Sequence, residues 1–342
     1  MRIAIVASPV TPLKPAQAGG AQSVVCDLAR GLARRGHAVQ LYCAAGSEVH
    51  GVELVMVPMP ADASAALVMP SGPPPGPAPG VAAAIQAMFR QIAREKPDAI
   101  SVHAFDVRAF ELAAKVPALV TLHLPPLVPS VVDAVRLIPN HRLVTVSHSC
   151  RREWEASGIP IGYVIRNGVA DIPVPDVPVE KVALVAGRIS PEKGVDHALQ
   201  AARGAGLPVR LAGAVYDPSH GVDLEGLEVL GALPQSELRY LMGRSAVTVC
   251  AVRWEEPFGL VAAEAQMAGC PVAAYRRGAL PEVVEDGVSG FLAAPDDVIE
   301  LQQAIVRCLA LDRVAVRVSA QQRLRLQSML DAYEYALAEV AA

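Results

Sequence analysis

Short apolar runs alternate with longer amphipathic stretches along nearly the whole chain, and this alternation limits the fold more than any other feature. Runs such as Ile3–Ala7 and Val182–Gly187 are almost wholly apolar, as strands are when a sheet is buried on both faces. Between them, stretches such as Ala21–Arg35 and Val195–Gly204 have the apolar spacing of helices. Strands that alternate with helices form parallel sheets covered by helices, so the sequence predicts an α/β fold.

The alternation comes in two successive sets, which predicts two Rossmann-like domains, and 342 residues are enough for both. The stretch Asp171–Val179 contains three prolines and predicts a stiff linker. We expect a first domain over residues 1–168, a linker over 169–180 and a second domain over 181–325. A final helix at about 326–342 is expected to cross back onto the first domain.

The predicted elements follow this pattern. The predicted strands are residues 3–7, 38–43, 54–58, 99–103, 118–123, 143–147 and 163–166, then 182–187, 209–214, 227–231, 247–251, 272–274 and 290–292. The predicted helices are residues 21–35, 81–95, 107–115, 150–157, 195–204, 235–243, 259–268, 280–286 and 298–309, with one long helix over 316–342. The Pro/Gly-rich segment 70–80 is predicted to be a surface loop.

Composition and charge exclude several classes of protein. The formal net charge of −4 argues against nucleic-acid binding, and residues 1–170 carry +4 whereas residues 171–342 carry −8. No stretch reaches the ~20 apolar residues of a membrane span, and the N-terminus lacks the pattern of a secretory signal. Six cysteines without a C-x-x-C pair argue against zinc and disulfides. We therefore expect a soluble cytoplasmic protein with no metal site and no cofactor.

The strongest functional pattern is Glu256-Pro-Phe-Gly-Leu-Val-Ala-Ala-Glu264, in which seven residues separate two glutamates. Gly259 opens a predicted helix, so the N–H groups of Phe258, Gly259 and Leu260 are expected to bind an anion at the helix N-terminus. The two carboxylates can accept hydrogen bonds from hydroxyls on either side of that anion. A sugar, a diphosphate and a ribose have this arrangement. The alternative is a capping role for Glu256 and a surface ion pair for Glu264.

A second pattern, Gly187-Arg-Ile-Ser-Pro-Glu-Lys-Gly194, follows the first strand of the second domain. A loop in that position lies at the carboxyl edge of a parallel sheet, where such folds bind ligands. Arg188 and Lys193 could neutralise a diphosphate, the first as a fork and the second as a point charge. The alternative is a solvated turn in which Ser190 caps a helix.

The N-terminal domain offers weaker candidates. Gly19 and Gly20 open a helix and allow close approach of a ligand to the backbone, but they form no G-x-G-x-x-G motif, which disfavours a nicotinamide dehydrogenase. His123 ends a buried strand at the carboxyl edge, facing the gap between the domains, where its imidazole could bond a sugar hydroxyl or a phosphate oxygen. His103 ends the preceding strand and is a weaker candidate. The chain has no D-x-D motif for metal-bridged diphosphate binding.

Several motifs occur in the order in which one family carries them, from residue 19 to about residue 292. They are G-G-x-Q, L-A-R-R-G-H-A-V, V-S-H-S, V-I-R-N-G-V, G-R-x-S-P-E-K-G and E-P-F-G-L-x3-E-A-x-x-x-G-x-P-V. In these motifs the chain resembles glycosyltransferase family 4, the retaining sugar-nucleotide transferases of the GT-B fold. Gln22 departs from the pattern, because many relatives carry Glu there.

The resemblance implies that the nucleotide sugar, with UDP as the expected nucleotide, binds the second domain and the acceptor binds mainly the first. By position, Glu256 would hold hydroxyls of the donor sugar and Glu264 the ribose, while Arg188 and Lys193 would bind the diphosphate. His123 would contact the sugar near its reacting carbon. Backbone groups around Gly231 and Leu233 would frame the base.

The expected reaction is transfer of a hexose or pentose to a hydroxyl acceptor with retention of configuration and without a metal. The short acceptor domain resembles antibiotic-tailoring members of the family, of the avilamycin type. Two alternatives share the fold: a sugar-nucleotide epimerase, and a transferase that acts on a membrane lipid or cell-envelope glycoconjugate. A nucleotide-sugar binding protein without activity is disfavoured by the histidine at the strand end.

Overall fold

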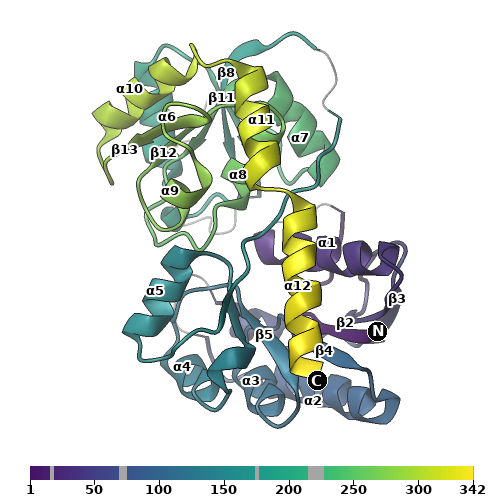
Figure 1. Cartoon of the computed structure of the whole chain (residues 1–342). Helices are drawn as coiled ribbons and strands as arrows, with labels where there is room; N and C mark the ends of the chain where they lie inside the picture. The colour runs from purple at the N-terminus through teal and green to yellow at the C-terminus, as the bar shows by residue number, and fades with distance from the viewer. Residues whose placement is uncertain (16–18, 69–74, 174–176, 215–226, 342) are drawn as a thin grey trace. The chain divides into compact units, whose positions relative to one another are not determined.

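The structure is a computed structural model that describes residues 1–15, 19–68, 75–173, 177–214 and 227–341 (Figure 1). The chain folds as two compact units. Unit 1 consists of residues 1–15, 21–166 and 327–342, and unit 2 consists of residues 16–20 and 167–326.

Unit 1 is built on a parallel sheet in the order β3-β2-β1-β4-β5-β6-β7. Its strands are β1 (Arg2–Val6), β2 (Ala38–Ala44), β3 (Glu53–Val57), β4 (Ala99–Val102), β5 (Ala118–Leu122), β6 (Leu143–Thr145) and β7 (Tyr163–Val164). Its helices are α1 (Gly20–Arg34), α2 (Pro79–Glu95), α3 (Val107–Ala113), α4 (Pro129–Val135), α5 (His148–Ala156) and α12 (Leu326–Ala341), with 3-10 turns η1 (Ala63–Ala66) and η2 (Asn140–Arg142).

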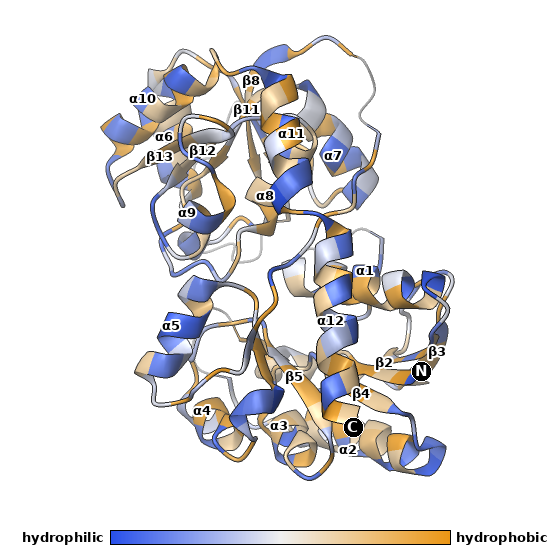
Figure 2. Cartoon of the chain, in the orientation of Figure 1, coloured by the Kyte–Doolittle hydropathy of each residue, from blue (hydrophilic) through white to orange (hydrophobic). Residues whose placement is uncertain are grey.

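Helices α2, α3 and α4 bury the apolar residues of one face of this sheet. The orange colour of its strands in Figure 2 shows how apolar they are. Helices α1 and α12 lie on the other face (Figure 1). Arg35, just after α1, pairs with Glu334 of α12, and His37 Nε2 lies 2.6 Å from the same carboxylate. The C-terminal helix is therefore part of unit 1, which confirms the prediction that it returns to the first domain.

Unit 2 is built on a second parallel sheet, in the order β10-β9-β8-β11-β12-β13. Its strands are β8 (Glu180–Ala186), β9 (Val209–Ala212), β10 (Glu228–Val229), β11 (Ser245–Cys250), β12 (Val272–Tyr275) and β13 (Gly290–Ala293). Its helices are α6 (Val195–Gly204), α7 (Gln235–Arg244), α8 (Leu260–Met267), α9 (Leu280–Val283), α10 (Val298–Cys308) and α11 (Arg313–Arg323), with the 3-10 turn η3 (Pro191–Lys193). Helices α6 and α10 pack on one face of the sheet.

In each sheet the strand order reverses once, between β1 and β4 in unit 1 and between β8 and β11 in unit 2. Ligands of such sheets bind outside the carboxyl ends of the strands at this reversal point. Two Rossmann-like parallel sheets confirm the predicted fold class.

Two sequence expectations need correction. The tail is two helices, α11 and α12, because the backbone turns at Leu324: Val169 N–H donates to the Leu324 carbonyl at 2.8 Å, and Leu326 N–H donates to the Val169 carbonyl at 3.0 Å. The proline-rich stretch before Ile138 contains helix α4, which the sequence analysis does not predict, with Pro129 in its first turn.

Three further expectations concern loops, thiols and membrane spans. Residues 70–74 of the predicted surface loop and 174–176 of the linker lie outside the described residues. All six cysteines are buried, and they form no disulfide within the described residues. Among the helices that the structure describes, none is both long and apolar enough to cross a bilayer.

Candidate functional site

The two sequence motifs of unit 2 meet at its reversal point. The loop of residues 187–194 follows β8 and the loop of residues 251–259 follows β11, and these two strands are neighbours in the sheet. The two loops are joined through the backbone, because Arg253 N–H donates to the Glu192 carbonyl at 2.9 Å. The motifs therefore form one site at the carboxyl edge of the sheet.

An ion pair lies at the centre of this site. Lys193 Nζ is 2.7 Å from Glu256 Oε2, and the indole N–H of Trp254 donates to the same oxygen at 2.8 Å. The ammonium group of Lys193 also lies 5.5 Å from the centre of the Trp254 ring. The structure thus brings together a cation and a carboxylate that the sequence assigns to different parts of a ligand.

Gly194 allows the first loop to lie against the second. Its φ of +60° is left-handed, and a Cβ at this position would lie 1.9 Å from the carbonyl oxygen of Ala251. Any side chain would push the loop that carries Lys193 away from the loop that carries Glu256. The glycine is therefore a steric requirement of the site.

Arg188 lies in the same loop, with Nη2 3.3 Å from Oε1 of the buried Glu192. The hydroxyl of Ser190 is buried and has no hydrogen-bond partner within the described residues. Ser190 precedes η3 but makes no side-chain capping bond, so the alternative capping role is wrong. The loop thus carries a guanidinium, an ammonium and a buried hydroxyl.

The helix that follows the second motif begins one residue later than predicted. Helix α8 begins at Leu260, with Gly259 before it at a φ of +92°, while Phe258 is buried in the preceding loop. The N–H groups without an acceptor inside the helix are therefore those of the N-cap residue Gly259 and of Leu260, Val261 and Ala262. Of the three groups predicted to face an anion, those of Gly259 and Leu260 belong to this set, and that of Phe258 does not.

Glu264 is buried rather than on the surface, so the surface ion pair considered in the sequence analysis is wrong. Its Oε1 accepts hydrogen bonds from Gln235 Nε2 at 2.7 Å and from Arg239 Nη2 at 3.2 Å, both on helix α7. Arg239 also donates to the carbonyl of Ala170 at 2.9 Å. The carboxylate is thus held by two side chains that the sequence analysis did not single out.

Three more predicted positions lie in loops or at a helix end. Gly231, with a φ of +67°, and Leu233 lie in the loop between β10 and α7, and both are half-buried. Gly19 precedes α1, which begins at Gly20. Gln22 donates from Nε2 to Thr11 Oγ1 at 3.1 Å, an interaction that needs no carboxylate.

In unit 1, His123 is hydrogen-bonded to His103. Their atoms Nε2 of His123 and Nδ1 of His103 are 2.9 Å apart, and His103 Nε2 is 2.9 Å from Ser101 Oγ. The two histidines directly follow the neighbouring strands β5 and β4. Burial lowers the pKa of His123 to about 4, and burial together with the neighbouring ring lowers the pKa of His103 well below its usual value. Both rings are therefore neutral at pH 7.

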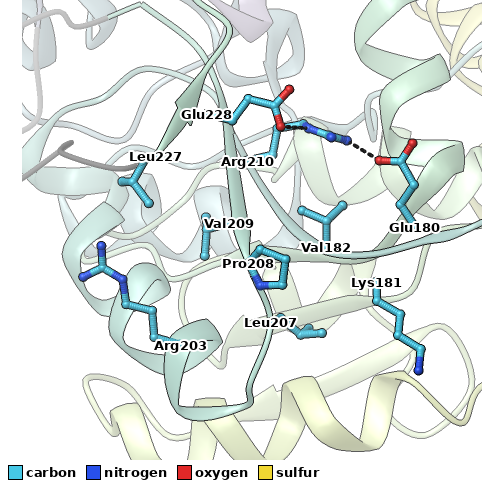
Figure 3. A pocket seen from close by; sticks show the side chains of 10 residues that line it. All are labelled: Glu180, Lys181, Val182, Arg203, Leu207, Pro208, Val209, Arg210, Leu227 and Glu228. Atoms are coloured by element: carbon cyan, nitrogen blue, oxygen red, sulfur yellow. Dashed lines mark hydrogen bonds and ion pairs between the residues drawn. The ribbon is translucent and has the colours of Figure 1, made fainter.

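A separate cavity of about 480 Å³ lies at the opposite edge of the second sheet (Figure 3). It is lined at the amino ends of the strands by Glu180, Lys181, Val209 and Glu228, among others. The motif residues do not line it, so it is distinct from the candidate site.

Sequence reasoning missed the residues that hold the predicted ones in place. Trp254 lies two positions before Glu256, and its proximity in the sequence was an available clue. Gln235 and Arg239 are four residues apart on α7, which places both on one face of that helix. Their link to Glu264 depends on how α7 packs against α8, which local sequence does not reveal.

Comparison with known proteins agrees with the motifs. The family model described as Glycosyltransferase Family 4 matches residues 18–171, and the model described as Glycosyl transferases group 1 matches residues 176–325. The D-inositol 3-phosphate glycosyltransferase of Mycobacterium marinum is 38% identical over 144 residues, which cover 37% of this chain and 30% of that protein. The chain spans less than half the length of the curated relatives that it matches.

Solved structures show the same fold. HepE from Anabaena, in complex with UDP and glucose, has a TM-score of 0.74 at 20% identity, over 99% of this chain and 100% of that one. AviGT4, a glycosyltransferase involved in avilamycin A biosynthesis, has a TM-score of 0.73 at 20% identity, over 100% of this chain and 98% of that one. With both family models matched and the GT-B fold observed, the chain belongs to glycosyltransferase family 4.

Proposed function

We propose that the chain transfers a hexose or pentose from a nucleoside-diphosphate sugar, with UDP as the nucleotide, to a hydroxyl acceptor, without a metal and with retention of configuration. The observation that carries the proposal is the pairing of Lys193 with Glu256 at the reversal point of the second sheet. The ammonium of Lys193 suits a diphosphate and the carboxylate of Glu256 suits sugar hydroxyls. The loops that carry them follow the adjacent strands β8 and β11. HepE, which shares the fold at 20% identity, was solved with UDP and glucose, so UDP is the first nucleotide to test.

Each candidate residue is assigned a role by its position in the family motifs. Arg188 and Lys193 would bind the diphosphate, with the N–H groups at the start of α8 as further donors to its oxygens. Glu256 would accept hydrogen bonds from donor-sugar hydroxyls and Glu264 from the ribose. His123 would contact the sugar near its reacting carbon.

Donor binding then exchanges one ionic partner for another. In the structure the charge of Lys193 is balanced by Glu256. An incoming diphosphate would bind the ammonium group of Lys193. Glu256 Oε2 would then be available to a hydroxyl of the sugar next to the diphosphate. A single ion pair would in this way couple recognition of the phosphate to recognition of the sugar.

Retention is consistent with displacement on the front face of the sugar. The bond between the anomeric carbon and the diphosphate oxygen breaks while the acceptor oxygen bonds to the same face. The acceptor proton passes to the leaving diphosphate oxygen. The contribution of the protein is then electrostatic: Arg188 and Lys193 stabilise the charge that develops on the leaving group.

We propose that the acceptor is a hydroxylated small molecule or oligosaccharide and that it is modified in the cytoplasm. The association with an oligosaccharide antibiotic or other secondary metabolite stays a prediction, because AviGT4 at 20% identity supports the fold alone.

The donor is tested by measuring the melting temperature and the binding heat of the protein with UDP, ADP, GDP and their glucose conjugates, in the presence and absence of EDTA. We expect stabilisation by UDP and UDP-sugar that EDTA does not change. Glu256→Gln should still bind UDP but lose the additional affinity for the UDP-sugar. If it no longer binds UDP, the roles of Glu256 and Glu264 are reversed; if no nucleotide binds the wild type, the proposal is wrong.

A further inference from the structure

Two pairs of polar residues lie at the ends of the neighbouring strands β4 and β5. Ser101 and His103 are two residues apart at the end of β4, and Thr121 and His123 are two residues apart at the end of β5. Side chains alternate between the faces of a sheet, so all four project to one face. On that face Tyr333 of helix α12 lies 3.0 Å from the Thr121 hydroxyl, and its ring is 5.9 Å from that of His103. The histidine pair is thus enclosed by two strands and the C-terminal helix.

The hydrogen bonds within this group have a definite direction. A neutral imidazole carries one N–H donor and one acceptor nitrogen, so a bond between two such rings must use one of each. Ser101 is fully buried, and within the described residues the only side-chain partner of its hydroxyl is His103 Nε2. Donation from Ser101 to His103 satisfies the hydroxyl hydrogen, whereas the reverse direction would leave that hydrogen buried without an acceptor.

The rest of the chain of bonds follows. Because His103 Nε2 accepts from Ser101, the proton of His103 is on Nδ1. That N–H donates to His123 Nε2 at 2.9 Å. His123 consequently carries its own proton on Nδ1.

We propose that His103 is a positioning residue that fixes His123 as the Nδ1–H tautomer, so that His123 offers the substrate a hydrogen-bond donor and not an acceptor. The inference rests on the proposed function, in which His123 contacts the sugar. A donor at this position suits a sugar ring oxygen, a hydroxyl oxygen or a phosphate oxygen. It also means that His123 does not act as the base that removes the acceptor proton.

The first test reads the tautomer without any substrate. Two-bond 15N–1H correlation spectra of histidine-labelled protein at pH 7 distinguish a protonated ring nitrogen from an unprotonated one. The signals of His123 are identified by their loss in His123→Gln. We expect the proton on Nδ1 in the wild type and a mixture of tautomers in Ser101→Ala. A proton on Nε2, or on both nitrogens, overturns the inference.

The second test measures catalysis with the UDP-sugar. His103→Leu is expected to lower kcat about 10- to 100-fold while the affinity for UDP stays unchanged, because the misplaced group acts on the reacting sugar. His103→Asn, whose amide can donate from nearly the same place, should recover most of the loss. Tyr333→Phe keeps the ring against His103 and is the matched control, with activity close to wild type.

These results separate the two proposals. Equal losses in His103→Leu and His103→Asn, each with a lowered melting temperature, would show that His103 is merely structural and overturn the inference. Absence of transfer with every donor in the wild type would instead contradict the proposed function, and the tautomer spectra would still decide the inference.

Discussion

The two candidate centres of the molecule differ in how they hold charge. In unit 2, Lys193 and Glu256 form an ion pair whose side chains are 20% and 12% exposed. In unit 1, His103 and His123 are each 5% exposed and neutral at pH 7. Of these two pairs, the charged one is the one that water still reaches.

The difference indicates different tasks. A pair of charges that stays partly hydrated can exchange its partner for a charged ligand at modest cost, because neither ion is left fully buried and unpaired. A neutral, buried pair cannot bind an ion in that way, but its geometry and tautomer are fixed by neighbours. We therefore expect changes in unit 2 to affect donor binding and turnover strongly, and changes in unit 1 to affect geometry and acid stability.

The largest expected effect is on turnover in unit 2. Arg188→Ala and Lys193→Ala should each lower kcat about 10²- to 10³-fold, because each removes a charge that stabilises the leaving diphosphate. The assay is release of UDP from the UDP-sugar, with circular dichroism to verify the fold. Lys181→Ala is the matched control, since Lys181 lies at the opposite end of β8. Near-normal turnover in both Arg188→Ala and Lys193→Ala would contradict the assigned difference between the two centres, because the charges of unit 2 would then contribute little to turnover.

A second, smaller effect concerns the contact that brings the two loops of unit 2 together. Gly194→Ala should lower the free energy of unfolding by about 3 kcal/mol, because it combines left-handed strain with a clash against the Ala251 carbonyl. Gly206→Ala is the matched control: its φ is +72° and a Cβ would meet nothing within 4 Å, so it should cost only about 1 kcal/mol. The comparison is made by urea denaturation, and equal losses would contradict a steric role for Gly194.

Much of the fold could be predicted because buried parallel strands are visible in short stretches of sequence. Every strand of both sheets was expected, and most boundaries agree within a few residues. The break between α11 and α12 was missed because it depends on hydrogen bonds of Leu324 and Leu326 with the distant Val169. Helix α4, which has Pro129 in its first turn, was not predicted.

The candidate site of unit 2 could be predicted because its groups lie in two contiguous motifs after strands. Its internal pairing could not, since the bond between Lys193 and Glu256 joins residues 63 positions apart. In unit 1 the sequence indicates His123 from its place at a strand end. The bond to His103 requires the pairing of β4 with β5, and Tyr333 reaches His103 and Thr121 only through the return of α12.

The last prediction tests the neutral half of the comparison through acid stability. The pKa of each buried histidine is lowered on folding, so below pH about 6.5 the unfolded chain binds a proton at each ring that the folded chain does not. The free energy of unfolding should therefore fall with decreasing pH, by about 1.4 kcal/mol per pH unit for each histidine, down to about pH 4 for His123. In urea denaturation between pH 7.5 and 4.5, His103→Leu should reduce the slope of this free energy against pH by about 1.4 kcal/mol per pH unit, which corresponds to one proton. Parallel slopes in the wild type and in His103→Leu would mean that the pair is not held neutral by the fold.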